Sequence, residues 1–259
     1  MFSNFIFDNK SNKLLGLICV RFDSVSGAET FSGGCETEVI TEKTPRSNKF
    51  YIIEQPYSAP MQFTFQVINE DGTPITPQKE RSIKKWLCQR GTYKLFQIDS
   101  HAGLYYNVNI SNPKLINVGD TVGMEFVVIT DSPFGYSPIQ NRKFSITSLM
   151  KQATLLIDHY DDYLYPTVTI TMLESGNLEI TNSTEQVGRF FRLNNVVTNE
   201  VITIDSEMPD ISSSIPTHNI FADFNKNWIR LVDGMNTLTF NLNCNVTITY
   251  REHREVGVY

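Results

Sequence analysis

The sequence predicts a mainly β protein of two domains, and three observations carry this prediction. Stretches in which β-branched and aromatic residues alternate with polar residues recur along the chain, which is typical of strands with one buried face. Hydrophobic residues make up 41% and charged residues 19% of the 259 positions, and the abundant Asn, Thr and Ser favour sheets with polar outer faces over helical bundles. The third observation is a break at Glu125–Pro138, where a strand-like run ends in a segment rich in Pro, Gly and Ser. We therefore place the first domain at residues 1–139 and the second at residues 140–259.

Before the break, strands and turns are expected to surround one helix. Met61–Asn69 shows the clearest alternation, with its apolar residues on one face and Gln and Thr on the other. Residues 23–35, which include Gly33 and Gly34, are expected to form a loop. The other strands are expected at Phe5–Phe7, Leu14–Phe22, Glu36–Thr41, Phe50–Glu54, Tyr93–Ile98, Tyr105–Ile110 and Val122–Thr130.

The helix is expected to begin at Pro77, because Thr76 suits the N-cap and Pro suits the first helical position. Gly91 suits the C-cap. Apolar residues spaced at i, i+3 and i+4 predict one buried stripe: Ile83, Trp86 and Leu87. The basic residues on the other side form either a solvated face or a docking surface: Lys79, Arg81, Lys84 and Lys85.

After the break almost every element is expected to be a strand, at spacings typical of a β-sandwich. Leu238–Tyr250 has apolar residues at every second position and predicts one long strand. Ser175–Asn177 predicts a tight hairpin turn, and Asp158–Pro166 predicts an acidic, aromatic loop. The remaining strands are expected at Lys143–Leu149 and Thr154–Asp158, as a linking pair, and at Thr167–Leu173, Leu178–Asn182, Phe190–Asn194 and Glu200–Asp205.

Composition and charge argue against several classes of protein. The net charge is -6 and no run of Lys and Arg occurs, so ordinary nucleic-acid binding is not expected. The chain shows neither a signal-peptide pattern nor a run of about 18 apolar residues, so we expect neither secretion nor a membrane span. The cysteines form no C-x-x-C pair and predict buried, reduced thiols, in line with assembly in a reducing cytoplasm: Cys19, Cys35, Cys88 and Cys244.

Few residues suggest catalysis or metal binding. No nucleophile elbow, phosphate-binding loop, dinucleotide fingerprint or H-E-x-x-H motif occurs. Asp158, His159, Asp161 and Asp162 form a dense cluster, but their spacing matches no EF-hand, and we interpret them as a solvated acidic loop. We therefore predict no enzyme, no metal ion and no cofactor, although a glycosidase carboxylate pair stays open because only its separation in space defines it. The other histidines stand singly: His101, His218 and His253.

Carbohydrate binding is a further hypothesis. β-Sandwiches often bind sugars by stacking them on an exposed Trp or Tyr beside polar groups. Trp228 has Asn225, Asn227 and Arg230 close by, so these four residues are the candidate ligand contacts. The alternative interpretation is that Trp228 is a core or rim aromatic residue.

Four stretches, in this order and spacing, carry a resemblance to a known family. The first is F-I-F-D-N-K-S-N-K-L-L-G-L, and the second is S-I-K-K-W-L with the following Y-K-L-F-Q-I and Y-Y-N-V. The third is the break itself, E-F-V-V-I-T-D-S-P-F-G-Y-S. The fourth comprises L-E-I-T-N, V-I-T-I-D-S, L-V-D-G-M-N-T-L-T-F and I-T-Y-R. Together they span nearly the whole chain, which resembles the distal tail protein (Dit) family of long-tailed, siphovirus-type bacteriophages.

The resemblance implies an N-terminal β-barrel or split-barrel-like domain with one α-helix, followed by a C-terminal galectin-like β-sandwich. It implies a homohexameric ring that joins the tail tube to the host-attachment apparatus and leaves a channel for phage DNA, without sequence-specific binding. The implied partners are the tail tube protein on one side and a tail-associated, tail-fibre or receptor-binding protein on the other, with the tape measure protein as a further candidate. The expected place is the virion, at the tail tip or baseplate, after assembly in the host cytoplasm.

Three functions follow from these observations. The first is a non-enzymatic structural hub of the distal phage tail. The alternative is a carbohydrate-binding or adhesin module that recognises the host cell surface through the second domain, and the third is an enzyme acting on cell-wall polymers. For a hub, the break at Glu125–Pro138 is expected to fix how the second domain is held, with Gly135 and its flanking prolines setting the geometry.

Overall fold

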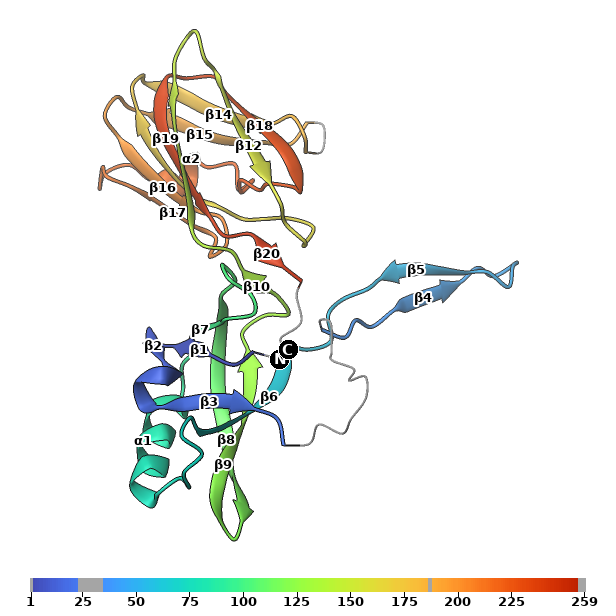
Figure 1. Ribbon diagram of the computed structural model, residues 1–259. Helices are drawn as coiled ribbons and strands as arrows, with labels where there is room; N and C mark the ends of the chain where they lie inside the picture. Colours follow the sequence, from blue (N-terminus) through green and yellow to red (C-terminus); the bar gives the residue numbers. More distant parts are fainter. Residues whose placement is uncertain (1, 23–34, 186–187, 256–259) are drawn as a thin grey trace. The chain divides into compact units, whose positions relative to one another are not determined.

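The computed structural model describes residues 2–22, 35–185 and 188–255 (Figure 1). The loop expected at residues 23–35 lies outside the described residues except for Cys35. Strands dominate, which confirms the mainly β prediction. The chain divides into two compact units: the first runs to Tyr136 and takes up the chain again at Arg254, and the second spans Ser137–His253. Each unit has its own hydrophobic core.

The first unit is organised around a seven-stranded antiparallel sheet in the order β2-β1-β7-β8-β9-β6-β3. Aromatic side chains fill its core, among them Phe5, Phe65, Phe96 and Phe126, all at most 2% exposed. A separate two-stranded sheet of β4 and β5 extends from this unit (Figure 1). The bounds are β1 (Phe5–Phe7), β2 (Lys10–Ser11), β3 (Leu17–Val20), β4 (Ile40–Lys43), β5 (Phe50–Glu54), β6 (Gln62–Asn69), β7 (Lys94–Ile98), β8 (Tyr106–Val118) and β9 (Asp120–Thr130).

Asn12 joins β1 to β3 across the opening of this sheet. It begins the 3-10 helix η1 (Asn12–Leu15) and is fully buried. Its Oδ1 accepts a hydrogen bond from the Phe5 N–H at 3.0 Å, and its Nδ2 donates to the Leu17 carbonyl at 2.7 Å. This side chain and one backbone hydrogen bond, from the Cys19 N–H to the Ser3 carbonyl at 3.0 Å, link the two edges in the described part of the chain in place of a continuous ladder, which agrees with a split barrel. The strand expected at Leu14–Phe22 begins only at Leu17, because Gly16 (φ 57°) ends η1 in the left-handed conformation.

Helix α1 (Pro77–Leu87) begins as predicted. The Thr76 Oγ1 accepts a hydrogen bond from the Lys79 N–H at 3.3 Å, so the expected N-cap is confirmed. The Trp86 ring stacks on Phe5 with centroids 5.7 Å apart, and its Nε1 donates to the Phe7 carbonyl at 3.3 Å. The predicted apolar stripe is also confirmed as buried: Ile83, Trp86 and Leu87.

The prediction that Gly91 caps this helix is wrong. Cys88 is the C-cap, and its N–H donates to the Lys84 carbonyl at 2.9 Å. Gly91 (φ 78°) lies in the turn that follows, where its left-handed conformation reverses the chain toward β7.

The segment after β9, where the sequence breaks, is held firmly against the first unit as far as Tyr136. Tyr136, the last residue of the short strand β10 (Gly135–Tyr136), exchanges two backbone hydrogen bonds of 2.9 and 2.7 Å with Tyr105. Phe134 is 4% exposed, and a Cβ added to Gly135 would lie 3.0 Å from the Tyr106 ring. Up to Tyr136 this segment is therefore an ordered part of the unit.

The second unit is a β-sandwich. One sheet has the order β11-β19-β13-β16-β17 and the other the order β12-β18-β14-β15 (Figure 1). Residues of both sheets form a single core. The sandwich also includes one short helix, α2 (Ile220–Asp223). Neither α2 nor α1 of the first unit is long and apolar enough to span a membrane. The bounds are β11 (Gln140–Ile146), β12 (Gln152–Ile157), β13 (Thr167–Met172), β14 (Gly176–Asn182), β15 (Phe190–Val196), β16 (Val201–Asp205), β17 (Asp210–Ser213), β18 (Gly234–Phe240), β19 (Cys244–Tyr250) and β20 (His253–Arg254).

Three details of the predicted strand series are wrong, for one reason. The strand expected at Leu238–Tyr250 is split between β18 and β19, which belong to different sheets. Ser175–Asn177 likewise joins β13 to β14 across the two sheets and is not a hairpin turn, and β11 and β12 are not a pair. Alternation shows only which side chains face the core, and both sheets of a sandwich face the same core. A chain that crosses between sheets therefore keeps its pattern.

Candidate functional site

The predicted ligand contacts lie together between α2 and β18, where the fold itself uses their side chains. The Asn225 Oδ1 accepts a hydrogen bond from the Arg192 N–H at 3.1 Å, and its Nδ2 donates to the Phe190 carbonyl at 2.9 Å. The Asn227 Nδ2 donates to the same carbonyl at 3.1 Å. Both amides therefore fasten this segment to β15.

Trp228 and Arg230 are also engaged within the second unit. The Trp228 ring meets Phe224 edge-on with centroids 4.8 Å apart and packs against the sandwich core. Arg230 pairs with Glu185, and its guanidinium carbon lies 3.8 Å from the centroid of the Tyr163 ring. The cavity that Trp228 and Arg230 help to line holds about 10 Å³, which is room for about one water molecule. Sugar contact at these four residues stays a prediction.

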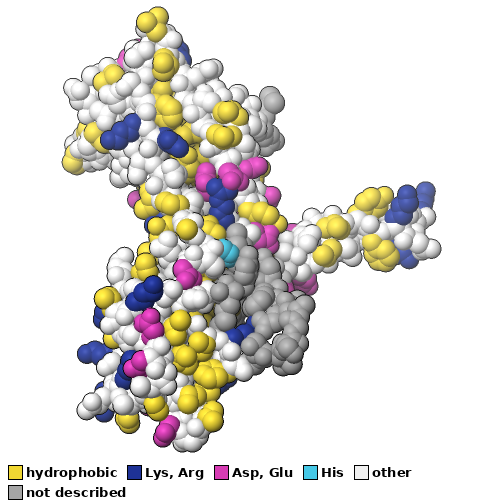
Figure 2. Space-filling model, viewed as in Figure 1, with side chains coloured by type: hydrophobic (Ala, Val, Ile, Leu, Met, Phe, Trp, Pro, Cys, Tyr) yellow, Lys and Arg dark blue, Asp and Glu magenta, His cyan; other side chains and the backbone are white. Residues whose placement is uncertain are grey.

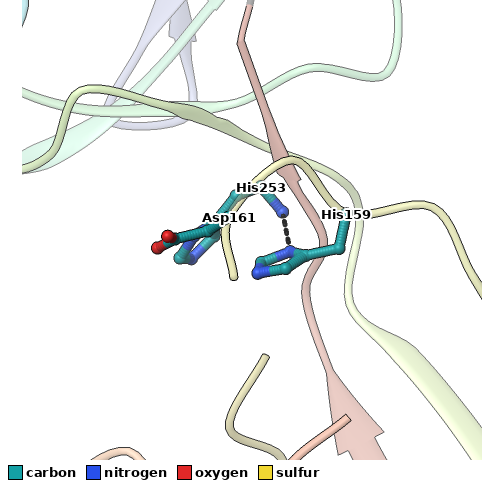
Figure 3. A group of neighbouring side chains, drawn as sticks. All are labelled: His159, Asp161 and His253. Carbon is teal, nitrogen blue, oxygen red and sulfur yellow. Dashed lines mark hydrogen bonds and ion pairs between the residues drawn. The ribbon is translucent and has the colours of Figure 1, made fainter. Parts of the chain in front are cut away.

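The acidic loop brings together two histidines that stand far apart in the sequence (Figure 3). The His159 and His253 rings have centroids 4.6 Å apart, and the Asp161 carboxylate lies 3.7 Å from the His253 Nδ1. The His159 Nδ1 accepts a hydrogen bond from the His253 backbone N–H at 2.9 Å. One nitrogen or oxygen from each of the three residues lies within 4.8 Å of the others, so a metal ion must be considered.

The hydrogen bonding favours a structural role for this cluster. Because the His159 Nδ1 accepts a hydrogen bond, the neutral ring carries its proton on Nε2. Burial lowers the pKa of His159, which keeps the ring in this neutral state. A metal-bound histidine normally donates its second ring N–H to an acceptor, whereas here that nitrogen faces a donor. The cluster therefore fits a hydrogen-bonded link between two loops better than a metal centre.

A second cluster joins the buried Glu200 to the half-buried His218 and Asp223. The His218 Nδ1 lies 2.5 Å from the Glu200 Oε1, and its Nε2 lies 3.1 Å from the Asp223 Oδ2. Burial opposes the charge on His218, but its hydrogen bonds to Glu200 and Asp223 outweigh this and raise its pKa. Burial also opposes the charge on Glu200, but hydrogen bonds from Ser213, His218 and the Val197 N–H lower its pKa. Since the Ser213 hydroxyl donates to Glu200 and not to His218, the cluster lacks the nucleophile–base pair of a hydrolase.

The surface of the first unit includes an exposed apolar hairpin, which we call the hairpin arm: β4, β5 and the turn between them, residues 40–54. In the described part of the chain its strands pair with each other alone, and every residue of both strands is exposed. Phe50, Tyr51, Ile52 and Ile53 follow one another at 60–64% exposure. Because successive side chains in a strand point to opposite faces, both faces of the arm are apolar. Figure 2 shows hydrophobic side chains along the arm on the side in view. Exposed apolar surfaces of this kind are typical of sites that contact another protein, a membrane or a ligand.

A second feature of the first unit is a groove of about 1090 Å³ between α1 and β8, which we call the helix groove. Pro77 and Pro113 contribute apolar surface to it, and the core residue Ile110 lies in its wall. Lys84 pairs with Glu80, which leaves three cations that have no ion-pair partner among the described residues: Arg81, Lys85 and Arg90. Arg81, Lys84 and Lys85 of the predicted basic side therefore line a groove, whereas Lys79 does not.

Two family models together match nearly the whole chain. The model described as "Phage tail protein N-terminal domain" matches residues 1–132, and the model described as "Phage tail C-terminal domain" matches residues 134–250. No curated protein matches the chain.

A solved structure shares the two-domain fold. The SPP1 Dit (gp 19.1) protein, described as a paradigm of the hub adsorption apparatus of phages that infect Gram-positive hosts, matches with a TM-score of 0.70 at 13% identity. The match covers 97% of this chain and 99% of that one. The resemblance predicted from the four sequence stretches is thus confirmed in family and in fold: the chain belongs to the phage tail protein family defined by these N- and C-terminal domains and has the fold of a Dit hub protein.

Proposed function

We propose that this phage tail protein is the hub of the distal tail. Six copies form a ring that joins the tail tube to the host-attachment apparatus at the tail tip or baseplate, and DNA passes through the central channel. The observation that carries this proposal is the similarity in fold to a hub protein over 97% of the chain. The first unit, residues 1–139 in the sequence-based division, builds the ring, and the galectin-like sandwich at residues 140–259 lies peripherally.

The hairpin arm supports an assembled state. Burying a large apolar side chain stabilises a contact by about 1.5–3 kcal/mol, and β5 exposes four such side chains in a row. A ring of identical subunits closes through heterologous contacts, in which one surface of each copy meets a different surface of its neighbour. An exposed arm meets this requirement because it reaches beyond its own unit's sheet.

The proposed axial partners are the tail tube protein on one side and a tail-associated, tail-fibre or receptor-binding protein on the other, with the tape measure protein as a further candidate. The net charge of -6 supports a channel that DNA traverses without sequence-specific binding. Burial raises the pKa of Cys244 to about 12, so this thiol stays protonated, and all four cysteines are free. Free thiols support assembly in the reducing host cytoplasm.

The test is negative-stain imaging of the purified full-length protein at high concentration, alone and mixed with the tail tube protein. We expect six-fold rings with an open centre, alone or on the partner. Monomers that persist and bind neither the tube protein nor a tail-associated protein would contradict the proposal.

The adhesin alternative predicts saturable binding to purified host cell wall. Since Trp228 packs on the core, Trp228→Phe is the variant that removes the indole while preserving an aromatic ring. Circular dichroism checks that the variant is folded. Loss of binding in the folded variant would favour the adhesin function, whereas no binding by the wild type would rule that function out.

A further inference from the structure

We infer that the hairpin arm of one copy lies in the helix groove of the next copy. This inference rests on the ring proposed above and names the contact that closes it. The arm and the groove are different surfaces of the same unit, as a heterologous ring contact requires. Each copy would give its arm to one neighbour and receive the arm of the other.

Most charges of the arm are arranged in two zones. Acidic residues lie at its base, where Glu36 and Glu38 precede β4 and Glu54 ends β5, while Glu42 lies farther along β4, next to Lys43 and opposite Tyr51. Basic residues flank or occupy the turn at its tip: Lys43, Arg46 and Lys49. Figure 2 shows hydrophobic side chains of the arm between these zones. The arm therefore offers an apolar middle beside a row of carboxylates.

The helix groove has the complementary arrangement. Its accessible apolar surface comes from the prolines at positions 77 and 113, above the buried Ile110, and its cations are the exposed Arg81, Lys85 and Arg90. Ligand pockets that enclose whole small molecules measure roughly 300–1,000 Å³, so a groove of about 1090 Å³ has room for several side chains of a hairpin. Arm carboxylates would meet groove cations while Phe50 or Ile52 covers the apolar surface.

The occupant of the groove is a second copy and not the chain's own arm. The arm's strands make no ladder with the seven-stranded sheet, from which the arm extends away (Figure 1), whereas α1 packs against that sheet through Trp86. The three cations alone could attract any polyanion, but a polyanion would leave the apolar part of the groove and both faces of the arm in water. A second copy covers both surfaces at once.

Charge reversal in the full-length protein tests this pairing. An arm variant carries Glu42→Lys and Glu54→Lys, a groove variant carries Arg81→Glu and Lys85→Glu, and a third protein carries all four changes. We expect each of the first two to raise the concentration at half-assembly by about tenfold or more, and the combined variant to recover most of that loss.

The readouts are sedimentation velocity over a concentration series and circular dichroism as a check of folding. The matched control reverses two exposed charges of the second unit, Glu207→Lys and Lys151→Glu, and should assemble like the wild type. A zero-length carbodiimide provides a direct measurement, because it should join an arm glutamate to Lys85 in the wild type and fail to do so in Lys85→Arg, which keeps the charge.

The outcomes separate this inference from the proposed function. A wild-type ring that the arm and groove variants form equally well would overturn the inference and leave the hub intact. Single reversals that weaken assembly without rescue in the combined variant would place these charges in other contacts and also overturn it. A groove variant that loses only binding to a DNA oligonucleotide would identify a polyanion site instead. If the wild type stays monomeric at every concentration and does not associate with the tube protein, the result would contradict both the arm–groove contact and the proposed hub function.

Discussion

Replacing Asn12 with alanine will destabilise the first unit far more than the same substitution at an exposed polar residue would. Asn12 is fully buried, and its amide joins the Phe5 N–H to the Leu17 carbonyl. Both of those residues are 1% exposed, so the truncation leaves a buried donor and a buried acceptor without partners. Each orphaned group costs about 1–3 kcal/mol, which gives a total of about 2–6 kcal/mol. Asn12→Asp will also destabilise, because it keeps an acceptor for Phe5 but directs a carboxylate oxygen at a carbonyl.

Urea denaturation followed by tryptophan fluorescence measures this effect in each unit separately. The chain has two tryptophans, Trp86 in the first unit and Trp228 in the second, so a Trp228→Phe background reports on the first unit alone. Asn48→Ala, at an exposed position in the turn of the hairpin arm, is the matched control and should change the free energy of unfolding by less than about 0.5 kcal/mol. A loss below about 1 kcal/mol for Asn12→Ala would refute the view that this side chain holds the split sheet together.

Three further predictions concern single side chains. Trp86→Ala should cost about 3–5 kcal/mol in urea titrations, and a much smaller loss would mean that the ring does not hold α1 to the sheet. Gly135→Ala should lower the free energy of unfolding by about 1–3 kcal/mol, since its Cβ would lie 3.0 Å from the Tyr106 ring. An unchanged urea midpoint would show that the segment shifts to accommodate the methyl group. Because Glu200 and Asp223 raise the pKa of His218, the stability advantage of wild type over His218→Gln should be full below pH 6.5 and shrink as pH rises through the raised pKa; an advantage independent of pH would contradict the ion pair.

Local signals in the sequence predicted helix α1 well, because its start and its buried face depend on neighbouring residues. Thr76 and Pro77 specify the first turn, and the stripe of Ile83, Trp86 and Leu87 follows from helical spacing. The sandwich crossings could not be predicted in this way, since strands of both sheets show the same alternation. The residues around Asn12 do not indicate its role either, because its two backbone partners, in β1 and β3, come together only when the sheet has formed and bent round.

The candidate sites show the same limit. His159 and His253 meet although 94 residues separate them, and nothing in either stretch indicates the other. Trp228 has polar neighbours in the sequence that suit a sugar site, but those neighbours hydrogen-bond to β15 and the ring packs on the core. The hairpin arm did leave a signal. Four consecutive large apolar residues at Phe50–Ile53 leave a strand no polar face, which fits either a fully buried strand or one that another chain covers.

The mass of the assembled particle tests the central claim most directly. Native mass spectrometry of the purified full-length protein, at concentrations high enough for assembly and also in the presence of the tail tube protein, counts the copies in the ring. The account predicts a species of six chains of 29.6 kDa each, alone or bound to the tube protein. A single chain at every concentration, with no complex formed with the tube protein, would contradict it.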